Sequence, residues 1–195
     1  MKTRPEEIAD SWRRERPDLA GSGLMLTVRL RAMGIMIDHE LARIAAAEAI
    51  HSDDLLLLFA MRRVGPPYCL RPTDVSALLN ITSGAATYRV ERLVRANLSH
   101  RIKDPRDGRS YVMQISQHGM DVIDRCVDAL AQVSDMALKA ADISESNMKS
   151  LTDVLHMVER GWESVIPPEE NPLRRGSTPA SQNHLWNGKS PHVEE

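Results

Sequence analysis

Aromatic residues and cysteines are scarce in this 195-residue chain, and each shortage excludes a class of protein. Phe, Trp and Tyr make up 4% of the residues, so the core must be built from aliphatic side chains, methionine and alanine. The two cysteines, Cys69 and Cys126, cannot form a disulfide framework, and they lack the spacing of metal ligands. We therefore expect a protein of a reducing compartment without a metal or another cofactor, in which Cys69 lies in a loop.

Long apolar runs are also missing. The longest covers residues 55–61, which is far too short to cross a bilayer. The first ten residues are charged and lack the apolar core of a secretory signal. These features predict a cytoplasmic protein with no membrane partner.

The charge of the chain is distributed unevenly. The formal net charge is −2, which by itself disfavours a nucleic-acid partner. Between Arg71 and Arg109, however, eight basic residues stand against four acidic ones, so that this stretch carries four net positive charges. Binding to phosphates responds to the local potential, and the acidic remainder therefore does not exclude it.

The basic stretch opens with a pattern typical of a short helix followed by a turn. Pro72 suits the first turn of a helix, because its ring fixes φ near the helical value. Val75, Leu78 and Leu79 give this helix one apolar face, and the pattern breaks at Asn80.

A second helix is expected over residues 83–96, capped by Thr82 or Ser83 through a side-chain oxygen that accepts from the first turn. Its buried side comprises Ala86, Val90, Leu93 and Val94, and its exposed side Ser83, Thr87, Tyr88, Arg89, Arg92 and Arg95. Small polar residues at the start with arginines further along are typical of a helix that enters a DNA groove.

Two strands with a Pro/Asp/Gly turn follow this second helix. The strands are expected over residues 100–103 and 111–115, and residues 104–109 between them carry the turn. A helix, a turn, a helix and a basic hairpin in this order predict a winged helix-turn-helix, within a fold that is mainly α with a small β-hairpin wing.

This stretch resembles the MarR family of bacterial transcriptional regulators. The wing motif Asp107-Gly108-Arg109, followed by Ile115-Ser116 and a helix that opens at Gln117, is similar to the signature of that family. The segment from Thr82 to Leu93 is similar to the recognition helix of its urate-responsive, PecS-like branch. The resemblance covers residues 12–158, and it implies a dimer built by the helices that flank the winged domain.

The residues expected to contact DNA are Arg71, Thr73, Thr82, Ser83, Gly84, Ala85, Thr87, Tyr88, Arg89 and Arg92 on the two helices, and Arg106, Asp107 and Arg109 on the wing. Arg109 is expected to enter the minor groove, with Asp107 orienting it through a charge-assisted pair. The alternative for each is a solvated surface residue, and which of them contacts a base stays open.

Trp12 has two interpretations. The first is a hydrophobic anchor that docks an N-terminal helix, expected over residues 4–14. The second comes from the resemblance, which implies that this tryptophan lines an effector pocket. In the PecS-like branch an acidic residue is expected where Leu56 stands, and an apolar side chain cannot pair with a polar ring N–H. A small anionic or aromatic effector is therefore a better expectation than urate.

The remaining pattern predicts four more helices, over residues 24–50, 53–64, 117–140 and 145–165. The first is apolar on more than one side, which indicates that a partner subunit covers part of it. Ser52 is expected to cap the second, a central and nearly all-apolar helix, and Ser144 to cap the last. The expected organisation is an extra helix (1–20), a dimerisation region (21–50 and 117–166), a DNA-binding domain (51–116) and a disordered tail (167–195).

These observations favour a dimeric, sequence-specific DNA-binding regulator, a repressor that a small ligand releases from a pseudo-palindromic operator on double-stranded DNA. The alternative is a winged-helix module for protein interaction or architecture without a ligand response. We do not expect an enzyme, because the sequence carries no nucleophile–base pair, phosphate loop or metal-ligand spacing.

Overall fold

The computed structural model describes residues 4–19, 23–104 and 110–167, and within these ranges the chain is mainly helical with one small sheet. The helices are α1 (Arg4–Glu15), α2 (Gly23–Ala47), α3 (Ser52–Arg63), α4 (Pro72–Leu78), α5 (Ser83–Arg95), α6 (Gln117–Ala140) and α7 (Glu145–Val165), with a 3₁₀ turn at Pro17–Leu19. The strands are β1 (Cys69–Leu70), β2 (Ser99–Lys103) and β3 (Tyr111–Ile115). The expected mainly α fold with a winged helix-turn-helix is confirmed.

Helix α3 forms the centre of the core. Its residues Leu55, Leu57, Leu58 and Met61 are completely buried, as the run of apolar residues in the sequence predicts. The helix packs against α2, α5, α6 and β3, so it joins the helix-turn-helix to the long helices. Because these leucines are surrounded on several sides, truncating any of them would leave a cavity at the junction of both parts.

The sheet has the strand order β1-β3-β2, and both pairings are antiparallel. Strands β2 and β3 form the predicted hairpin, with Arg101 opposite Met113. The expectation that Cys69 lies in a loop is wrong, since Cys69 belongs to β1 and pairs with Gln114. A two-residue strand is too short to show the alternating polarity on which the prediction of strands depends.

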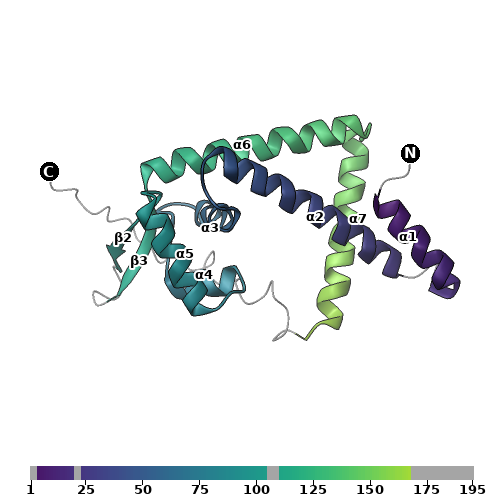
Figure 1. The fold of residues 1–195 in the computed structure, drawn as a ribbon, viewed down its shortest axis with the longest axis horizontal. Helices are drawn as coiled ribbons and strands as arrows, with labels where there is room; N and C mark the ends of the chain where they lie inside the picture. Colours follow the sequence, from purple (N-terminus) through teal and green to yellow (C-terminus); the bar gives the residue numbers. More distant parts are fainter. Residues whose placement is uncertain (1–3, 20–22, 105–109, 168–195) are drawn as a thin grey trace.

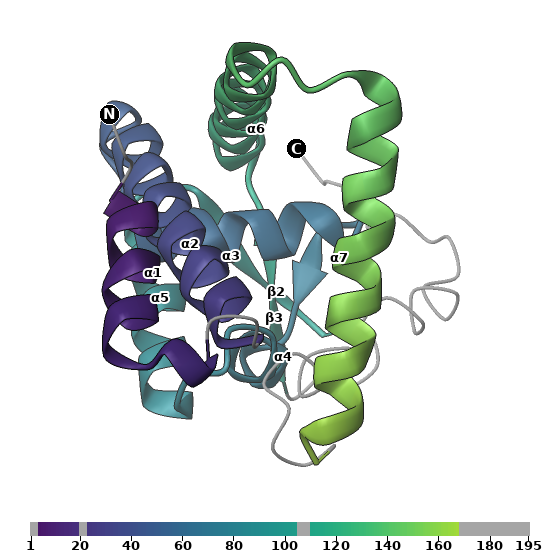
Figure 2. The same cartoon turned by 90° about the vertical axis from the view of Figure 1, so that its right-hand side faces the viewer.

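The elements separate into two ends of an elongated molecule (Figure 1). Helices α3 to α5 and the sheet lie at one end, whereas α1, the first half of α2 and α7 lie at the other. Helix α6 spans the distance between them, and α7 turns away from its far end (Figures 1 and 2). Helix α7 contains no buried residue, which distinguishes it from the helices around α3.

The local geometry explains two of the differences between the predicted and the observed helix ends. The cap of α3 is His51 instead of Ser52, because the His51 Nδ1 atom accepts a hydrogen bond of 3.1 Å from the Asp53 amide. Helix α2 ends at Ala47 and not at residue 50, because Ala49 has a positive φ of 55° that turns the chain out of the helix. The predicted bounds of α6 and α7 are confirmed, and Ser144 caps α7 as expected.

Gly119 permits a close approach between the wing and α6. A Cβ atom at this position would lie 2.0 Å from the Leu98 carbonyl oxygen. The same carbonyl accepts from the Ser116 amide at 3.1 Å, and the Ser116 hydroxyl caps α6 by accepting from the Gly119 amide at 2.9 Å. Only glycine therefore fits at this position, just after the chain leaves β3 and enters α6.

We expect Gly119→Ala to lower the free energy of unfolding by about 1–3 kcal/mol, because backbone atoms must shift to accept the methyl group. The matched control is Gly84→Ala in α5, where a Cβ meets no atom within 4 Å and alanine favours the helix. Chemical denaturation of both variants measures the difference. Equal stability of Gly119→Ala and the unaltered chain would contradict the close approach.

Candidate nucleic-acid interface

Helix α5 is anchored by one side and capped at its start. Ala86, Val90 and Leu93 are buried against the core, and the Thr82 hydroxyl accepts from the Ala85 amide at 3.2 Å. The predicted cap and most of the predicted buried face are therefore confirmed, although Val94 is only half-buried. The opposite side of α5 is left to form a surface.

Small polar residues and one large ring occupy that surface. Ser83, Gly84 and Thr87 are exposed, Ala85 is half-buried, and Tyr88 keeps 56% of its surface accessible. The Thr87 hydroxyl donates to the Ser83 carbonyl at 3.0 Å, which leaves its methyl group and an oxygen lone pair at the surface. A ring and short side chains of this kind let a helix approach a base-pair edge closely.

Arg89 and Arg92 do not belong to this exposed face, which corrects the sequence prediction. Arg89 is 3.0 Å from the Asp53 carboxylate, and its side chain is only 16% exposed. Arg92 Nε donates to the Asp54 carboxylate, with the nearer oxygen at 2.6 Å. Both arginines lean toward the start of α3, because two carboxylates there attract them more strongly than solvent does.

The second of these pairs is linked to the ring on the surface. The Asp54 hydrogen bond, as the largest cause, raises the pKa of Arg92, and the guanidinium lies 5.3 Å from the centroid of the Tyr88 ring. A cation held over an aromatic face restricts the ring as well as the arginine. The buried Asp54 thus fixes the position of an exposed residue of α5.

Arg71 connects the start of α4 to the base of the wing. Its guanidinium contacts the Asp104 carboxylate at 2.7 and 2.8 Å, and Asp104 is only 3% exposed. The Arg71 amide also donates to the Asp74 carboxylate at 3.1 Å. Arg71 therefore has a structural partner, and its exposed fraction, 41% of the side chain, is what remains for a ligand.

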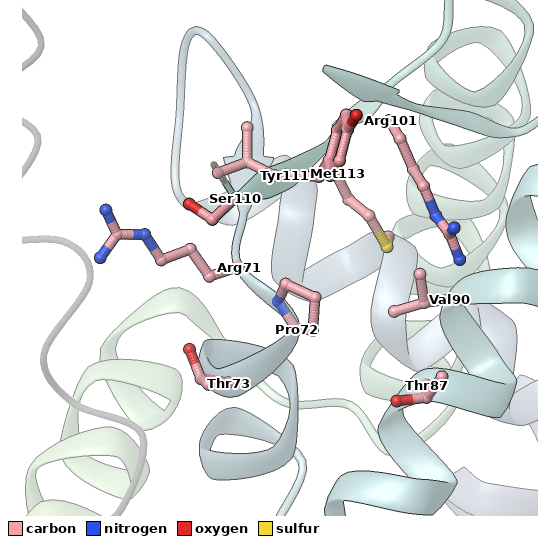
Figure 3. A pocket seen from close by; sticks show the side chains of 10 residues that line it. Arg71, Pro72, Thr73, Thr87, Val90, Arg101, Ser110, Tyr111 and Met113 are labelled. Carbon is pink, nitrogen blue, oxygen red and sulfur yellow. The ribbon is translucent and has the colours of Figure 1, made fainter. Parts of the chain in front are cut away.

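A groove of about 520 Å³ lies between α4, α5 and the wing strands (Figure 3). It is lined by Arg71, Pro72, Thr73, Thr87, Val90, Arg101, Ser110, Tyr111, Val112 and Met113. Figure 3 shows Thr73 on α4 and Thr87 on α5, and Met113 lies opposite Val90 across the groove. Three of the predicted residues, Arg71, Thr73 and Thr87, therefore come together around one concave surface.

Among the residues that the structure describes, the other predicted ones do not line this groove. Arg106, Asp107 and Arg109 lie outside the described residues. Trp12 lies on α1, which packs on α2 at the end of the molecule away from α5, and it is 43% exposed (Figure 1). One chain by itself therefore does not bring Trp12 to the end that holds α5.

Sequence reasoning missed the acidic partners and two of the groove residues. Asp53 and Asp54 were visible only as acids in the first turn of α3, a common feature of helix starts. Arg101, 3.7 Å from Glu91, and Tyr111 are exposed residues of β2 and β3, and no pattern in the sequence says which groove they line.

Neither cysteine chemistry nor metal chemistry accounts for this surface. Burial raises the pKa of the Cys69 thiol to about 11, so the reactive thiolate is rare near neutral pH. Among the residues that the structure describes, no group of three or more His, Cys, Asp or Glu side chains is placed to hold a metal ion. Within the same ranges, no helix is long and apolar enough to span a membrane.

A short helix, a turn, a second helix with an exposed polar side, and a hairpin beside it define a winged helix-turn-helix protein. Solved structures share this fold. MarR from E. coli in its apo form superimposes with a TM-score of 0.56 and 21% identity, over 67% of this chain and 93% of that one. Sco3205 from Streptomyces coelicolor, a MarR family regulator solved in complex with DNA, gives a TM-score of 0.57 and 21% identity, over 73% and 88% of the two chains.

A relative in sequence also carries a helix-turn-helix in its name. The HTH-type transcriptional regulator PecS of Dickeya dadantii is 29% identical over 122 residues, which cover 63% of this chain and 74% of PecS. No protein-family model matches the chain. The predicted resemblance to MarR-family transcriptional regulators is thereby confirmed. A response to urate stays untested.

Proposed function

We propose that the chain is a homodimeric, cytoplasmic transcriptional regulator that represses its targets from a pseudo-palindromic operator and leaves the DNA when a small ligand binds. The observation that carries the proposal is the exposed side of α5, presented next to a wing whose flanking sequence is basic. MarR from E. coli has been solved with operator DNA on the same fold, at 20% identity, which supports a DNA partner here.

The DNA contact divides into base reading and phosphate contact. Thr87 and Tyr88 project from the middle of α5, where a helix inserted into the major groove meets base edges. The wing residues Arg106 and Arg109 supply charge beside it, and minor-groove insertion is the expected role of Arg109. Arg71 and Thr73, at the start of α4, are suited to a phosphate on the groove's rim.

Dimerisation is supported by apolar surface that one chain leaves uncovered. Helix α7 has 21 residues and none is buried, although Leu151, Val154 and Trp162 form one apolar stripe at 43–55% exposure. On α2, Leu30, Met33 and residues 35–37 are likewise 38–54% exposed. A helix of this length has little stability of its own in water, and a monomer rarely exposes so much apolar area. A second copy, related by a two-fold axis, covers both helices and matches a palindromic site.

The effector is proposed to be an aromatic carboxylate or a similar amphipathic anion. Leu56, 41% exposed, opens onto a groove of about 690 Å³ between α3, α4 and α6. Its other lining residues are Phe59, Ala60, Arg62, Arg63, Leu78, Leu79 and Val127. Arg62 is already paired with Asp124 at 2.8 Å, whereas Arg63 is exposed at the groove and available to a carboxylate. Apolar walls beside one guanidinium favour such a ligand over a purine with several polar ring positions.

The first prediction separates phosphate contact from base reading. Arg109→Ala is expected to weaken binding to every DNA sequence and to reduce the salt dependence, with a log–log slope smaller by about 1 per subunit. Thr87→Ala is expected to change the preferred base at its position, at a cost of about 1–3 kcal/mol for the preferred site alone. Titrations of both variants at several salt concentrations measure these effects. Unchanged affinity in Arg109→Ala would refute the role of the wing.

The second prediction concerns the stripe on α7. We expect Leu151→Glu combined with Val154→Glu to convert the dimer to monomers, because a charge in a buried interface is costly to desolvate. Lys149→Glu on the polar side of the same helix, where the side chain is 80% exposed, serves as the control and should remain dimeric. Sedimentation equilibrium at micromolar protein distinguishes one chain mass from two. A monomeric unaltered protein would disprove the dimer.

The third prediction tests the effector. Phenolic carboxylates are expected to raise the thermal midpoint of the free protein and to dissociate its operator complex, because a releasing ligand must prefer the unbound state. Leu56→Glu should abolish both effects through like-charge repulsion, and Lys149→Glu should retain them. Thermal shift with and without operator DNA measures the linkage. Stabilisation by purines alone, or stabilisation that survives in Leu56→Glu, would contradict the proposed ligand class.

A further inference from the structure

Two consecutive acids at the start of α3 hold two arginines of α5. Asp53 contacts Arg89 at 3.0 Å, and Asp54 contacts Arg92 at 2.6 Å. Arginines 89 and 92 are three residues apart and lie on the same flank of α5, so the two pairs form a short row. Both acids lie in the first turn of α3, where the helix dipole interacts favourably with negative charge.

The two pairs differ in their environment. Asp54 is 4% exposed, and the Arg92 Nη2 atom is also shielded from solvent. The side chain of Asp53 is 39% exposed, and its second carboxylate oxygen lies 3.6 Å from His51 Nδ1, an exposed ring at the helix cap. The Asp54–Arg92 pair is therefore closed to solvent on its carboxylate side. In the Asp53–Arg89 pair the carboxylate is open to solvent, whereas the arginine side chain, which directly follows Tyr88 on α5, is only 16% exposed.

An internal ion pair of an arginine competes with a phosphate. Sequence-independent binding to DNA depends on cations that neutralise phosphates and release counterions. A guanidinium whose carboxylate partner is 3.0 Å away contributes little to that process until the pair opens. Base contacts from other residues are unaffected by the pair, because they do not depend on Arg89.

We propose that Asp53 holds Arg89 in an internal ion pair and thereby restrains the charge-driven, sequence-independent part of binding to DNA. The inference rests on the proposed function as a DNA-binding regulator. On the correct operator, contacts from residues such as Thr87 and Tyr88 hold α5 in the groove whether or not Arg89 is released. On random DNA those contacts are missing, and the closed pair deprives the complex of a phosphate contact.

The substitution Asp53→Asn tests this role, because it removes the charge and keeps the size of the side chain. We expect affinity for random-sequence duplex to rise about threefold or more, and the log–log salt slope to steepen by about 1 per subunit as Arg89 gains a phosphate. Operator affinity should rise by a similar factor, because a phosphate contact strengthens binding to every sequence. In an Arg89→Ala background, Asp53→Asn should change nothing, because the cation that it releases is absent.

The adjacent acid supplies a matched control. Asp54→Asn removes the same charge one residue away, but it breaks a buried pair, so it should lower the thermal midpoint and weaken binding to operator and random duplex alike. Asp53→Asn should lower the thermal midpoint less than Asp54→Asn, because the Asp53 side chain is 39% exposed and the Asp54 side chain only 6%.

Two results would overturn the proposal. An Asp53→Asn variant with unchanged or weaker binding to random duplex would show that Asp53 does not restrain Arg89. A gain in affinity that persists in the Arg89→Ala background would assign the effect to general charge repulsion instead. Both are distinct from failure of the proposed function, in which the unaltered protein binds neither operator nor random DNA.

Discussion

The burial of α3 is the constraint on which the rest of the structure depends. Leu55, Leu57, Leu58 and Met61 have no accessible surface, so α3 must be surrounded by other elements. This packing requires α2, α5, α6 and β3 to meet around one helix. Ion pairs at the two ends of α3 attach its neighbours further. Asp53 and Asp54 hold α5 at one end, and Arg62 holds Asp124 of α6 at the other. Helix α5, which is proposed to contact DNA, and α6, which leads to the proposed dimerisation helix α7, are thereby both attached to α3.

The arginines on and around α5 are paired with carboxylates of the same chain. Arg71 pairs with Asp104, Arg89 with Asp53, Arg92 with Asp54, and Arg101 lies near Glu91. The positive stretch that stands out in the sequence is therefore less available to phosphates than a count of charges indicates. A regulator must distinguish one operator from a genome of competing sites. Weaker charge-driven binding helps it to do so, because base contacts then account for a larger share of the binding free energy.

The helices of the winged domain could be predicted because their signals are local. Pro72 opens α4, Thr82 caps α5, and the 3,4 spacing of Val90 and Leu93 marks the buried side. The His51 cap and the two-residue strand at Cys69 escaped prediction, because an imidazole is a rare cap and two residues show no period. The pairing of Asp53 with Arg89 joins positions 36 apart in sequence, so it depends on how α3 crosses α5. No pattern within either segment contains that crossing.

The central claim is that two copies of α5 read one duplex. Chemical footprinting of the unaltered protein on an operator selected from random sequences tests it most directly. The account predicts two protected stretches of major groove, centred about 10–10.5 base pairs or a multiple of that spacing apart, with protected minor groove outside each where a wing would lie. A single protected stretch, or protection confined to the sugar–phosphate backbone with no sequence enriched by selection, would contradict it.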